Sequence, residues 1–196
     1  MKIGKNWTKI YLEVINLFKY AGDISEISHY IIDKFLENKN IAVDATLGNG
    51  HDTDFLAENF KKVYAFDIQK CTCDSYEDKN KDNVQVINNS HEYIKDYVFE
   101  NPDCIMYNLG FLPGGNKEIT TMHESSLKSI KNGLEILKSG GIMSVAIYRG
   151  HDEGKVEENI IIDYVKRLPK DKYGVMEHCF LNRSETAPIL LIIEKK

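Results

Sequence analysis

The sequence contains no long apolar run. A membrane-spanning helix needs roughly 18 or more consecutive apolar residues, and no stretch of this chain approaches that length. The first seven residues, MKIGKNW, also lack the continuous apolar core of a secretory signal peptide. We therefore expect a cytoplasmic protein with no membrane partner.

Cysteine is scarce, and the four cysteines form no CxxC pair. A chain of this size without paired cysteine spacing does not indicate a disulfide framework. Cys71 and Cys73 have no second pair that would complete a zinc site. We therefore expect reduced thiols and no metal.

An excess of positive charge is also missing. The chain carries 25 Lys plus Arg against 30 Asp plus Glu, which gives a net charge of −5. Nonspecific attraction to a nucleic acid backbone needs the opposite sign. Any contact with RNA must therefore be local.

The composition that is present belongs to an ordinary globular protein, with 42% hydrophobic and 28% charged residues in 196. This excludes disordered and collagen-like classes, and the length predicts a single domain. Helical spacing of apolar residues predicts one helix over about residues 10–21 and a second that begins after Asp23. Asp23 and Glu26 have the spacing of a capping box. The buried face of the second helix is predicted to carry Ile24, Ile27, Ile31 and Phe35.

From residue 41 onward, short apolar runs alternate with helical stretches, which is the pattern of βαβ units. The run ILLII at residues 189–193 is apolar throughout, as expected for a strand covered on both faces. Residues 41–196 are therefore predicted to form a doubly wound α/β sheet, preceded by N-terminal helices in residues 1–40. Strands are predicted near residues 41–45, 63–66, 84–87, 104–109, 142–148, 175–181 and 189–193, and helices near 52–58, 91–98, 127–137 and 156–168.

The first predicted strand runs into a glycine-containing turn, VDATLGNGHDT at residues 43–53. Gly48 and Gly50 lack Cβ atoms, so a ligand can approach the backbone closely at the carboxyl end of the strand. Asp67 ends the second strand, where a carboxylate can accept both hydroxyls of a ribose. This spacing predicts a nucleoside ligand, and an ordinary turn capped by Asp44 is the alternative.

The same loop discriminates between nucleoside ligands. NAD requires a third glycine, but Thr53 occupies that position, and Asp44 would lie close to the pyrophosphate. The chain also has no GxxxxGK[ST] motif for ATP. S-adenosylmethionine carries an ammonium and a sulfonium but no phosphate, so Asp44 and Asp52 are compatible with it. The sequence therefore favours S-adenosylmethionine as the cofactor.

Four groups of residues resemble those of one bacterial family. They are residues 42–53, residues 64–69 (YAFDIQ) with Ser90 and His91, residues 108–115 (NLGFLPGG) with 119–121 (ITT), and residues 148–154 (YRGHDEG). Together they are similar to the tRNA 5-aminomethyl-2-thiouridine methyltransferases, formerly described as rRNA methylases. The resemblance extends from about residue 41 to the carboxyl terminus.

The resemblance implies a Rossmann-like class I methyltransferase sheet with an antiparallel last strand, S-adenosylmethionine as cofactor and the anticodon stem-loop of tRNA as partner, often in a homodimer. By matched position, the cofactor would be bound by Asn49, Asp52, Asp67, Gln69, Ser90 and His91, with Asp44, Gly48 and Gly50 shaping its loop. The acceptor side would contain Asn108 together with Leu109, Gly110, Phe111, Pro113, Gly114, Tyr148 and Arg149.

Methylation of an amine requires a neutral nitrogen with an available lone pair. The side-chain oxygen of Asn108 can accept the amine's hydrogens and aim that lone pair. His151 is a candidate base because imidazole titrates near neutral pH, although an ordinary loop histidine is the alternative. Phe111 and Tyr148 are candidates to stack on a flipped base, or else belong to the core, and Arg149 to contact a phosphate.

Other features complete the expectations. His29, His123 and His178 have no motif context and are expected to be structural or solvated. Only residues 70–83 separate the second and third strands, so we expect no full helix there and an adenine pocket completed by residues 71–76.

The leading function is conversion of 5-aminomethyl-2-thiouridine to its methylaminomethyl form at the tRNA wobble position. Methylation of rRNA or of a small amine, and a non-catalytic nucleoside-binding module, are the alternatives. The glycine-containing loop at residues 110–115 argues against the last, because a sensor needs no room for an acceptor.

Overall fold

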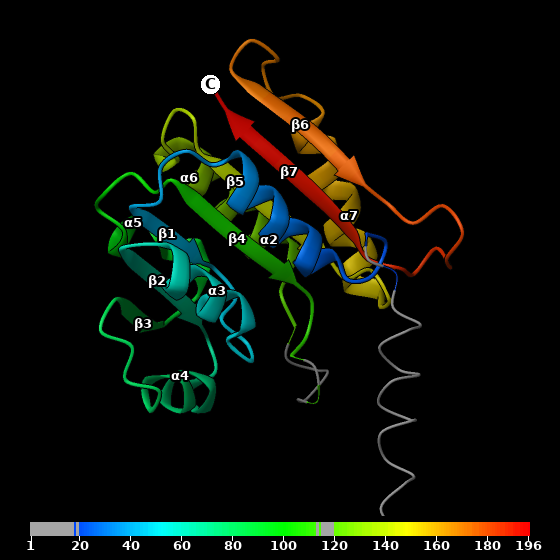
Figure 1. Ribbon diagram of the computed structural model, residues 1–196. Coiled ribbons are helices and arrows are strands. Elements are labelled where there is room, and N and C mark those ends of the chain that lie inside the picture. Colours follow the sequence, from blue (N-terminus) through cyan, green and yellow to red (C-terminus); the bar gives the residue numbers. More distant parts are fainter. Residues whose placement is uncertain (1–17, 19, 113, 115–119) are drawn as a thin grey trace, which may run out of the picture.

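The computed structural model describes residue 18, residues 20–112, residue 114 and residues 120–196. The helix expected over residues 10–21 therefore lies almost wholly outside the described residues. Among the described helices, none has the length and apolar character that a membrane crossing requires. In chain order the elements are α2 (Ile24–Phe35), β1 (Ile41–Asp44), α3 (His51–Asn59), β2 (Lys62–Asp67), α4 (Lys70–Glu77), β3 (Val84–Asn88), η1 (His91–Tyr93), α5 (Ile94–Tyr97), β4 (Cys104–Leu109), α6 (His123–Ile136), β5 (Ile142–Ile147), α7 (Asp152–Val165), β6 (Tyr173–His178) and β7 (Ile189–Lys195) (Figure 1).

The strands form a seven-stranded sheet in the order β3-β2-β1-β4-β5-β7-β6. Strands β1 to β5 are parallel, whereas β7 is antiparallel to both β5 and β6. The predicted doubly wound sheet with an antiparallel last strand is confirmed. The chain winds outward from β1 to β3 and then returns to place β4 on the other side of β1. This reversal is the switch point at which such sheets bind ligands.

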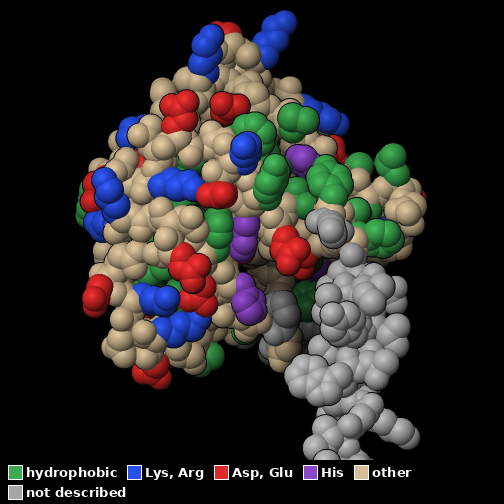
Figure 2. Space-filling view, in the orientation of Figure 1, with side chains coloured by type: hydrophobic (Ala, Val, Ile, Leu, Met, Phe, Trp, Pro, Cys, Tyr) green, Lys and Arg blue, Asp and Glu red, His purple; other side chains and the backbone are tan. Residues whose placement is uncertain are grey.

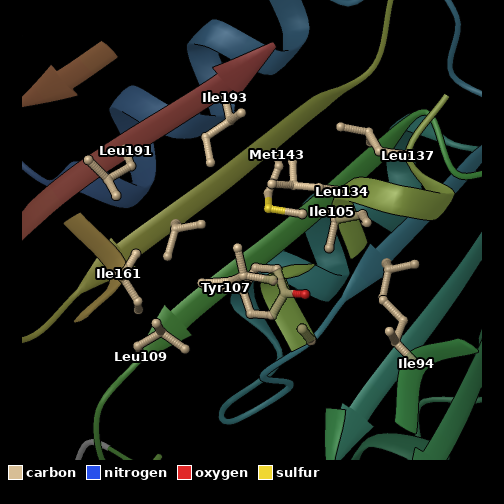
Figure 3. Packing of buried hydrophobic residues seen from close by; sticks show 14 of the residues in the cluster. Ile94, Ile105, Tyr107, Leu109, Leu134, Leu137, Met143, Ile161, Leu191 and Ile193 are labelled. Atoms are coloured by element: carbon tan, nitrogen blue, oxygen red, sulfur yellow. The ribbon is translucent and has the colours of Figure 1, made fainter. Parts of the chain in front are cut away.

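Helices cover both faces of the sheet. In Figure 1, α2 and α3 lie on the near face, and α6 and α7 lie on the far face. Neighbouring residues of β4 alternate accordingly, since Tyr107 packs in the cluster with α6 and α7 while Met106 packs in the cluster with α2 and α3. Figure 3 shows Leu134 and Ile161 on the same side of β4 as Tyr107. Because helices cover both faces of the sheet, side chains on both faces of a strand are buried, and the strands are therefore apolar at consecutive positions.

The buried face of α2 differs from the prediction. Ile24, Ser28 and Ile32 form the buried line, whereas Phe35 is 67% exposed. The reason is a hydrogen bond of 2.6 Å between the buried hydroxyls of Ser28 and Ser144 on β5, which satisfies both groups and holds the helix on the sheet. A pattern of apolar residues contains no information about such a pair. The predicted face is therefore correct at Ile24, which is buried, and wrong at Phe35, while Ile27 is half-buried beside the core.

The segment between β2 and β3 also differs from the prediction, because it contains the eight-residue helix α4. Cys73 and Tyr76 of this helix are buried against Leu47 and Ala65. Packing of these side chains stabilises a helix that its charged sequence does not favour. The helix expected over residues 91–98, in contrast, is divided into η1 and α5.

The carboxyl end of α6 is closed by a lysine from β7. The amino group of Lys195 donates to the carbonyl oxygens of Leu134 at 2.8 Å, Glu135 at 3.0 Å and Leu137 at 2.5 Å. Carbonyls at the end of a helix have no partner within the helix, and a cation there also interacts favourably with the helix dipole. Burial lowers the pKa of Lys195. This contact fixes the last strand against α6, on the far face of the sheet.

Candidate active site

A cavity of about 1000 Å³ lies at the carboxyl ends of the parallel strands. Its walls come from the loops after β1, β2, β3 and β4, from the first two turns of α2 and α6, and from Tyr148 after β5. Most of the residues that the sequence predicts for the cofactor line it: Gly48, Asn49, Gly50, Asp52, Asp67, Gln69, Ser90 and His91.

Asp44 lies behind the cavity wall and holds the first loop. Its fully buried carboxylate accepts hydrogen bonds from the backbone N–H of Thr46 at 3.0 Å and from the hydroxyl of Thr53 at 2.5 Å. Burial, followed by the neighbouring Asp52 carboxylate, raises the pKa of Asp44 to about 7. The buried carboxyl group of Asp44 thus holds the loop after β1 in place through hydrogen bonds to residues before and after its two glycines.

The two glycines of this loop are required by its backbone. Gly48 has a φ of +48° and Gly50 a φ of +79°, both in the left-handed region that favours glycine. A Cβ atom at Gly50 would also lie 2.5 Å from a ring carbon of Tyr76 on α4. Tyr76 therefore packs behind the loop, and residues 71–76 do not line the cavity as an adenine wall.

Asp67 connects the ends of the first two strands. Its carboxylate accepts the backbone N–H of Gly48 at 3.0 Å and that of Gln69 at 2.8 Å, one on each oxygen. Partial burial raises the pKa of Asp67. Because a carboxylate offers about four acceptor positions, each oxygen can accept one further hydrogen bond. This is the arrangement that two ribose hydroxyls require.

His91 places an unsatisfied polar atom in the cavity wall. Its imidazole is buried, and its Nδ1 has no hydrogen-bond partner among the described residues. Burial lowers the pKa of His91 to about 4, so the ring is neutral at physiological pH. A buried polar group without a partner is costly, and a ligand with hydrogen-bonding groups would satisfy it. The neighbouring Ser90 caps η1 by accepting the N–H of Glu92 at 3.3 Å.

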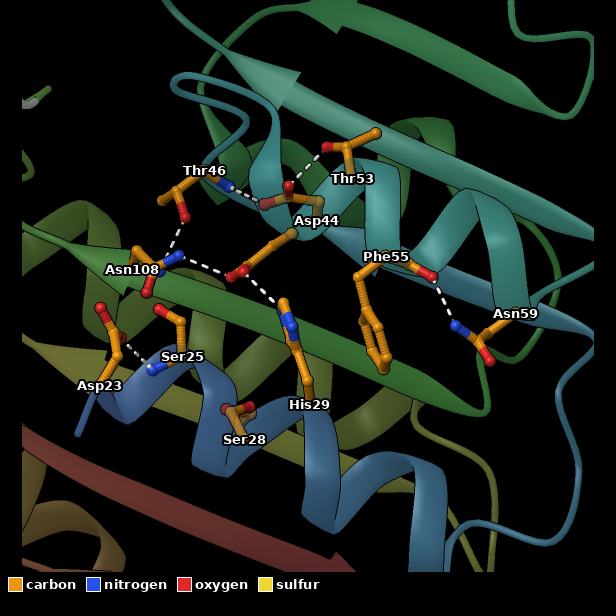
Figure 4. Close-up of polar contacts among 12 residues, drawn as sticks. Asp23, Ser25, Ser28, His29, Asp44, Thr46, Thr53, Phe55, Asn59 and Asn108 are labelled. Atoms are coloured by element: carbon orange, nitrogen blue, oxygen red, sulfur yellow. Dashed lines mark hydrogen bonds and ion pairs between the residues drawn. The ribbon is translucent and has the colours of Figure 1, made fainter. Parts of the chain in front are cut away.

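In another part of the cavity wall, a chain of hydrogen bonds joins three elements and includes Asp52, which the sequence predicts for the cofactor. Asn108 at the end of β4 donates its Nδ2 to Asp52 of α3 at 2.6 Å, and the other carboxylate oxygen of Asp52 lies 2.7 Å from Nε2 of His29 on α2. The ring of His29 stacks on Phe55 with a centroid distance of 3.9 Å. Figure 4 shows Asn108 and His29 converging on the carboxylate that they share.

Sequence reasoning missed His29, which was expected to be structural or solvated. The structure places it in the cavity wall. Its partners Asp52 and Asn108 lie far along the chain, so no local motif contains all three residues. The available signal was a single histidine on a predicted amphipathic helix, which is common and nonspecific.

The predicted acceptor residues divide into two sets. Gly110, Phe111 and Tyr148 line the cavity. Leu109 does not, because its side chain is fully buried in the core between the sheet and α6 and α7. Gly114 is described but is not part of the lining, and Pro113 lies outside the described residues.

His151 and Arg149 are also absent from the cavity wall. Nε2 of His151 lies 3.1 Å from the hydroxyl of Thr120, and its ring meets Phe111 edge-on. The guanidinium of Arg149 donates to the carbonyl of Ala187 at 2.7 Å and pairs with Glu158 at 2.5 Å. The structure therefore gives both side chains contacts that hold loops together, where the sequence predicted a base and a phosphate contact.

The lining is acidic. Lys128 is a basic residue of the described wall, and its amino group is already paired with Glu92 at 2.9 Å. Figure 2 shows basic and acidic side chains interspersed on one face of the molecule, without a broad basic surface. A negative wall favours cationic ligands and disfavours phosphates. The carboxylates of the lining are Asp23, Glu26, Asp52, Asp67, Glu92 and Glu124.

The sequence predicts no metal, but the structure brings together three side chains of kinds that can bind a metal ion. Donor atoms of His123, Glu124 and Glu153 lie within 4.8 Å of one another. His123 pairs with Glu153 at 2.7 Å and with Glu124 at 3.2 Å, and the contact with Glu153 raises the pKa of the histidine. In this structure the cluster is held together by these contacts between the histidine and the two carboxylates.

These features fit S-adenosylmethionine, because they offer a diol acceptor, two loop glycines, a neutral buried imidazole and an acidic wall for a sulfonium. The doubly wound sheet with this cavity at its switch point defines a class I methyltransferase that uses S-adenosylmethionine as cofactor. The chain belongs to the family whose model, described as "Putative rRNA methylase", matches residues 63–194.

Similar proteins include the tRNA (mnm(5)s(2)U34)-methyltransferase, chloroplastic, of Arabidopsis thaliana, which is 32% identical over 190 residues covering 88% of this chain and 69% of the relative. A "putative rRNA-methylase" from Clostridium thermocellum has a structure with a TM-score of 0.83 at 34% identity, covering 91% of this chain and 99% of that chain. A "putative methyltransferase" from Streptococcus mutans, solved in complex with SAH, has a TM-score of 0.80 at 38% identity and covers 88% of this chain and 97% of that chain.

Proposed function

We propose that this protein methylates the primary amine of 5-aminomethyl-2-thiouridine at the wobble position of tRNA, which yields 5-methylaminomethyl-2-thiouridine. The name of the Arabidopsis relative supports this substrate. The chemistry of the cavity supports an amine as the acceptor, and the tRNA identity comes from the relatives.

The observation that carries the proposal is the orientation of Asn108. Its amide group faces the Asp52 carboxylate at 2.6 Å, and a carboxylate accepts hydrogen bonds but cannot donate them. The nitrogen of the amide must therefore face Asp52, which leaves Oδ1 as the atom that accepts hydrogens from an amine. The backbone N–H of Asn108 is fixed as well, because it donates to the hydroxyl of Thr46 at 2.7 Å.

In this proposal Asp67 holds the ribose, and Gly48 and Gly50 let the first loop approach the cofactor. His91 offers a neutral polar contact beside them. When bound, S-adenosylmethionine supplies an electrophilic methyl group. The chain's own contribution is to position the acceptor, because displacement at a methyl carbon depends chiefly on alignment.

The acidic wall has a second role in this proposal. A primary amine is mostly protonated near neutral pH, so carboxylates such as Asp23, Glu26 and Asp52 attract it as an ammonium. The ammonium must lose a proton to solvent before its nitrogen can attack, and the neutral nitrogen then forms its bond to the methyl carbon as the bond from that carbon to the cofactor's sulfur breaks. Accepting groups around the amine, with Oδ1 of Asn108 among them, then orient its remaining hydrogens and the lone pair.

The size of the cavity suits two ligands. Its volume of about 1000 Å³ lies at the upper end of small-molecule sites, which run to roughly 1,000 Å³. Phe111 and Tyr148 line the acceptor side, and Tyr148 is 38% exposed, so its ring is accessible for stacking. Enzymes that modify a base in a loop commonly extrude that base and stack it on aromatic side chains.

The test uses purified protein, S-adenosylmethionine and tRNA from cells that lack the methyl modification. Mass analysis of the wobble nucleoside is expected to show a gain of one methyl group on 5-aminomethyl-2-thiouridine. Matched tRNA that already carries the methylated nucleoside serves as the control and is expected to accept none. Methyl incorporation only into rRNA, or only into a free small amine, would replace this proposal with one of the alternatives.

A further inference from the structure

The hydrogen-bonded chain from His29 to Asn108 is more elaborate than a cofactor site requires. Asp52 is only 4% exposed, and each of its two oxygens has a partner. One partner is Asn108, on which the proposed chemistry depends. The other is His29, a residue of α2 with no assigned role.

The ring of His29 is fixed in orientation. Phe55 lies three residues after Asp52 on α3, so both side chains share one face of that helix. The imidazole stacks on Phe55 with an interplanar angle of 7° while its Nε2 reaches Asp52. Because Asp52 is an acceptor, Nε2 carries the hydrogen and donates it. One helix thus provides both the carboxylate and the surface that sets the ring plane.

The position of His29 is fixed as well. Its neighbour Ser28 is bonded to Ser144 of β5 at 2.6 Å, and Ile24 and Ile32 are buried on either side. This anchor prevents α2 from shifting along the sheet, so the imidazole is held at one distance from α3. The buried hydroxyl pair that shifts the buried face of α2 therefore also places His29.

We propose that His29 is a positioning residue: by donating to Asp52 it holds that carboxylate, and thereby the Asn108 amide, in the orientation that presents Oδ1 to the acceptor. The proposal rests on the proposed function in so far as the acceptor is an amine. A carboxylate held on one oxygen alone can rotate about its terminal torsion, which varies broadly. Loss of the histidine would therefore disorder Asn108 without removing any group that contacts the cofactor.

The decisive experiment compares two substitutions of His29 in the full chain. Glutamine can place an amide N–H near the position of Nε2, whereas alanine cannot donate. His29→Ala is expected to lower kcat on the order of tenfold to a hundredfold, as expected for a misplaced group, with an unchanged Kd for S-adenosylmethionine. His29→Gln is expected to recover much of that loss. Tyr30→Ala, an exposed change on the same helix, is the matched control and is expected to retain wild-type kcat.

A double variant tests whether the effect passes through Asn108. If it does, His29→Ala combined with Asn108→Ala is expected to be no slower than Asn108→Ala alone. If the fold-decrease in kcat of the double variant equalled the product of the two single decreases, His29 would act independently of Asn108. That result would overturn the proposal. A fall in cofactor affinity with His29→Ala would overturn it as well.

A second measurement does not depend on the substrate. The side-chain NH₂ resonances of Asn108, assigned by their loss in Asn108→Ala, report its bond to Asp52. His29→Ala is expected to shift them and His29→Gln to restore them, whereas unchanged resonances would refute the proposal. If the wild-type protein failed to methylate tRNA while these shifts appeared, the proposed function would fail and the positioning role would stand.

Discussion

The two sides of the cavity are built differently. The cofactor side consists of the carboxyl ends of β1, β2 and β3: Gly48 lies in the loop after β1, Asp67 is the last residue of β2, and His91 begins η1 after β3. The acceptor side joins α2, α3 and the end of β4 through His29, Asp52 and Asn108. The first side depends on backbone geometry at strand ends. The second depends on side chains that meet only when two helices pack on the sheet.

This difference implies that the two sides can be damaged separately. A change on the acceptor side should affect turnover, and a change on the cofactor side should affect binding of S-adenosylmethionine. Asp44 supports the loop that serves both, and Lys195 belongs to neither. Four changes test this division.

The largest expected effect is that of Asn108→Ala. Removing the group that orients the acceptor is expected to lower kcat on the order of a hundredfold to a thousandfold, comparable to loss of one stabilising contact in other active sites. The Kd for S-adenosylmethionine, measured by calorimetry, is expected to stay within about twofold of wild type. Asn159→Ala, an exposed substitution on α7, is the control. If the variant instead kept normal turnover but bound S-adenosylmethionine more weakly, Asn108 would belong to the cofactor side and the assignment of the two sides would be wrong.

The pH dependence of the free energy of unfolding tests the role of Asp44, which supports the loop used by both sides. The pKa of Asp44 is raised to about 7 in the folded protein, against 3.8 for an unperturbed group, so the folded state binds this proton more tightly than the unfolded state. Its contribution is therefore complete below about pH 4 and is lost as the pH rises to about 7. Urea unfolding of the ligand-free protein is expected to show a loss of about 2–3 kcal/mol between about pH 5 and about pH 8.

Asp44→Asn is the control for this dependence, because asparagine retains an acceptor for Thr46 but does not titrate. The variant is expected to show a flatter profile over the same pH range. A profile equal to that of wild type would show that another group causes the dependence.

Asp67→Ala tests the cofactor side. The change removes the proposed ribose acceptor and also the partner of two backbone N–H groups. The Kd for S-adenosylmethionine is expected to rise on the order of tenfold to a hundredfold, as for the loss of hydrogen bonds to a charged group. At saturating cofactor, kcat is expected to stay within a few-fold of wild type. Asp74→Ala, an exposed change on α4, is the control, and equal affinity in both variants would contradict the assignment.

The smallest effect on function is expected for Lys195→Met. The variant loses three hydrogen bonds to the end of α6, and we expect the free energy of unfolding to fall by about 1–3 kcal/mol. Turnover and cofactor affinity are expected to be unchanged, because the contact is remote from the cavity. Lys196→Met, on the neighbouring exposed residue, is expected to leave stability near wild type. A selective loss of turnover would show that the contact between β7 and α6 affects the acceptor side.

Much of the fold could be predicted, because strands buried on both faces and helices with one apolar face leave clear periodicities. The doubly wound α/β sheet and the cofactor loop follow from such patterns, whereas the strand order does not. The failures have local causes: α2 is turned by Ser28, which bonds Ser144, and α4 forms because Tyr76 packs behind Gly50. Both depend on a partner distant in the sequence.

The acceptor residues show the same limit. Their positions after β4 and β5 could be inferred, but not the direction of each side chain. Arg149 turns to Glu158 and Ala187, and Leu109 turns into the core. Alternation along a strand and competition between partners decide these directions, and a single sequence shows neither.

The sequence by itself determined the sheet, the left-handed glycines of the first loop and the carboxylate at the end of β2, because each is a requirement of the local backbone or of strand burial. Only the tertiary structure decided which polar side chains face one another across the cavity. Asp52 is next to the glycine loop in sequence, but its carboxylate is directed by His29 and Asn108, which other elements bring to it. Hydrogen bonds act over about 3 Å, whereas these residues are separated by whole helices and strands, so packing must bring them together first.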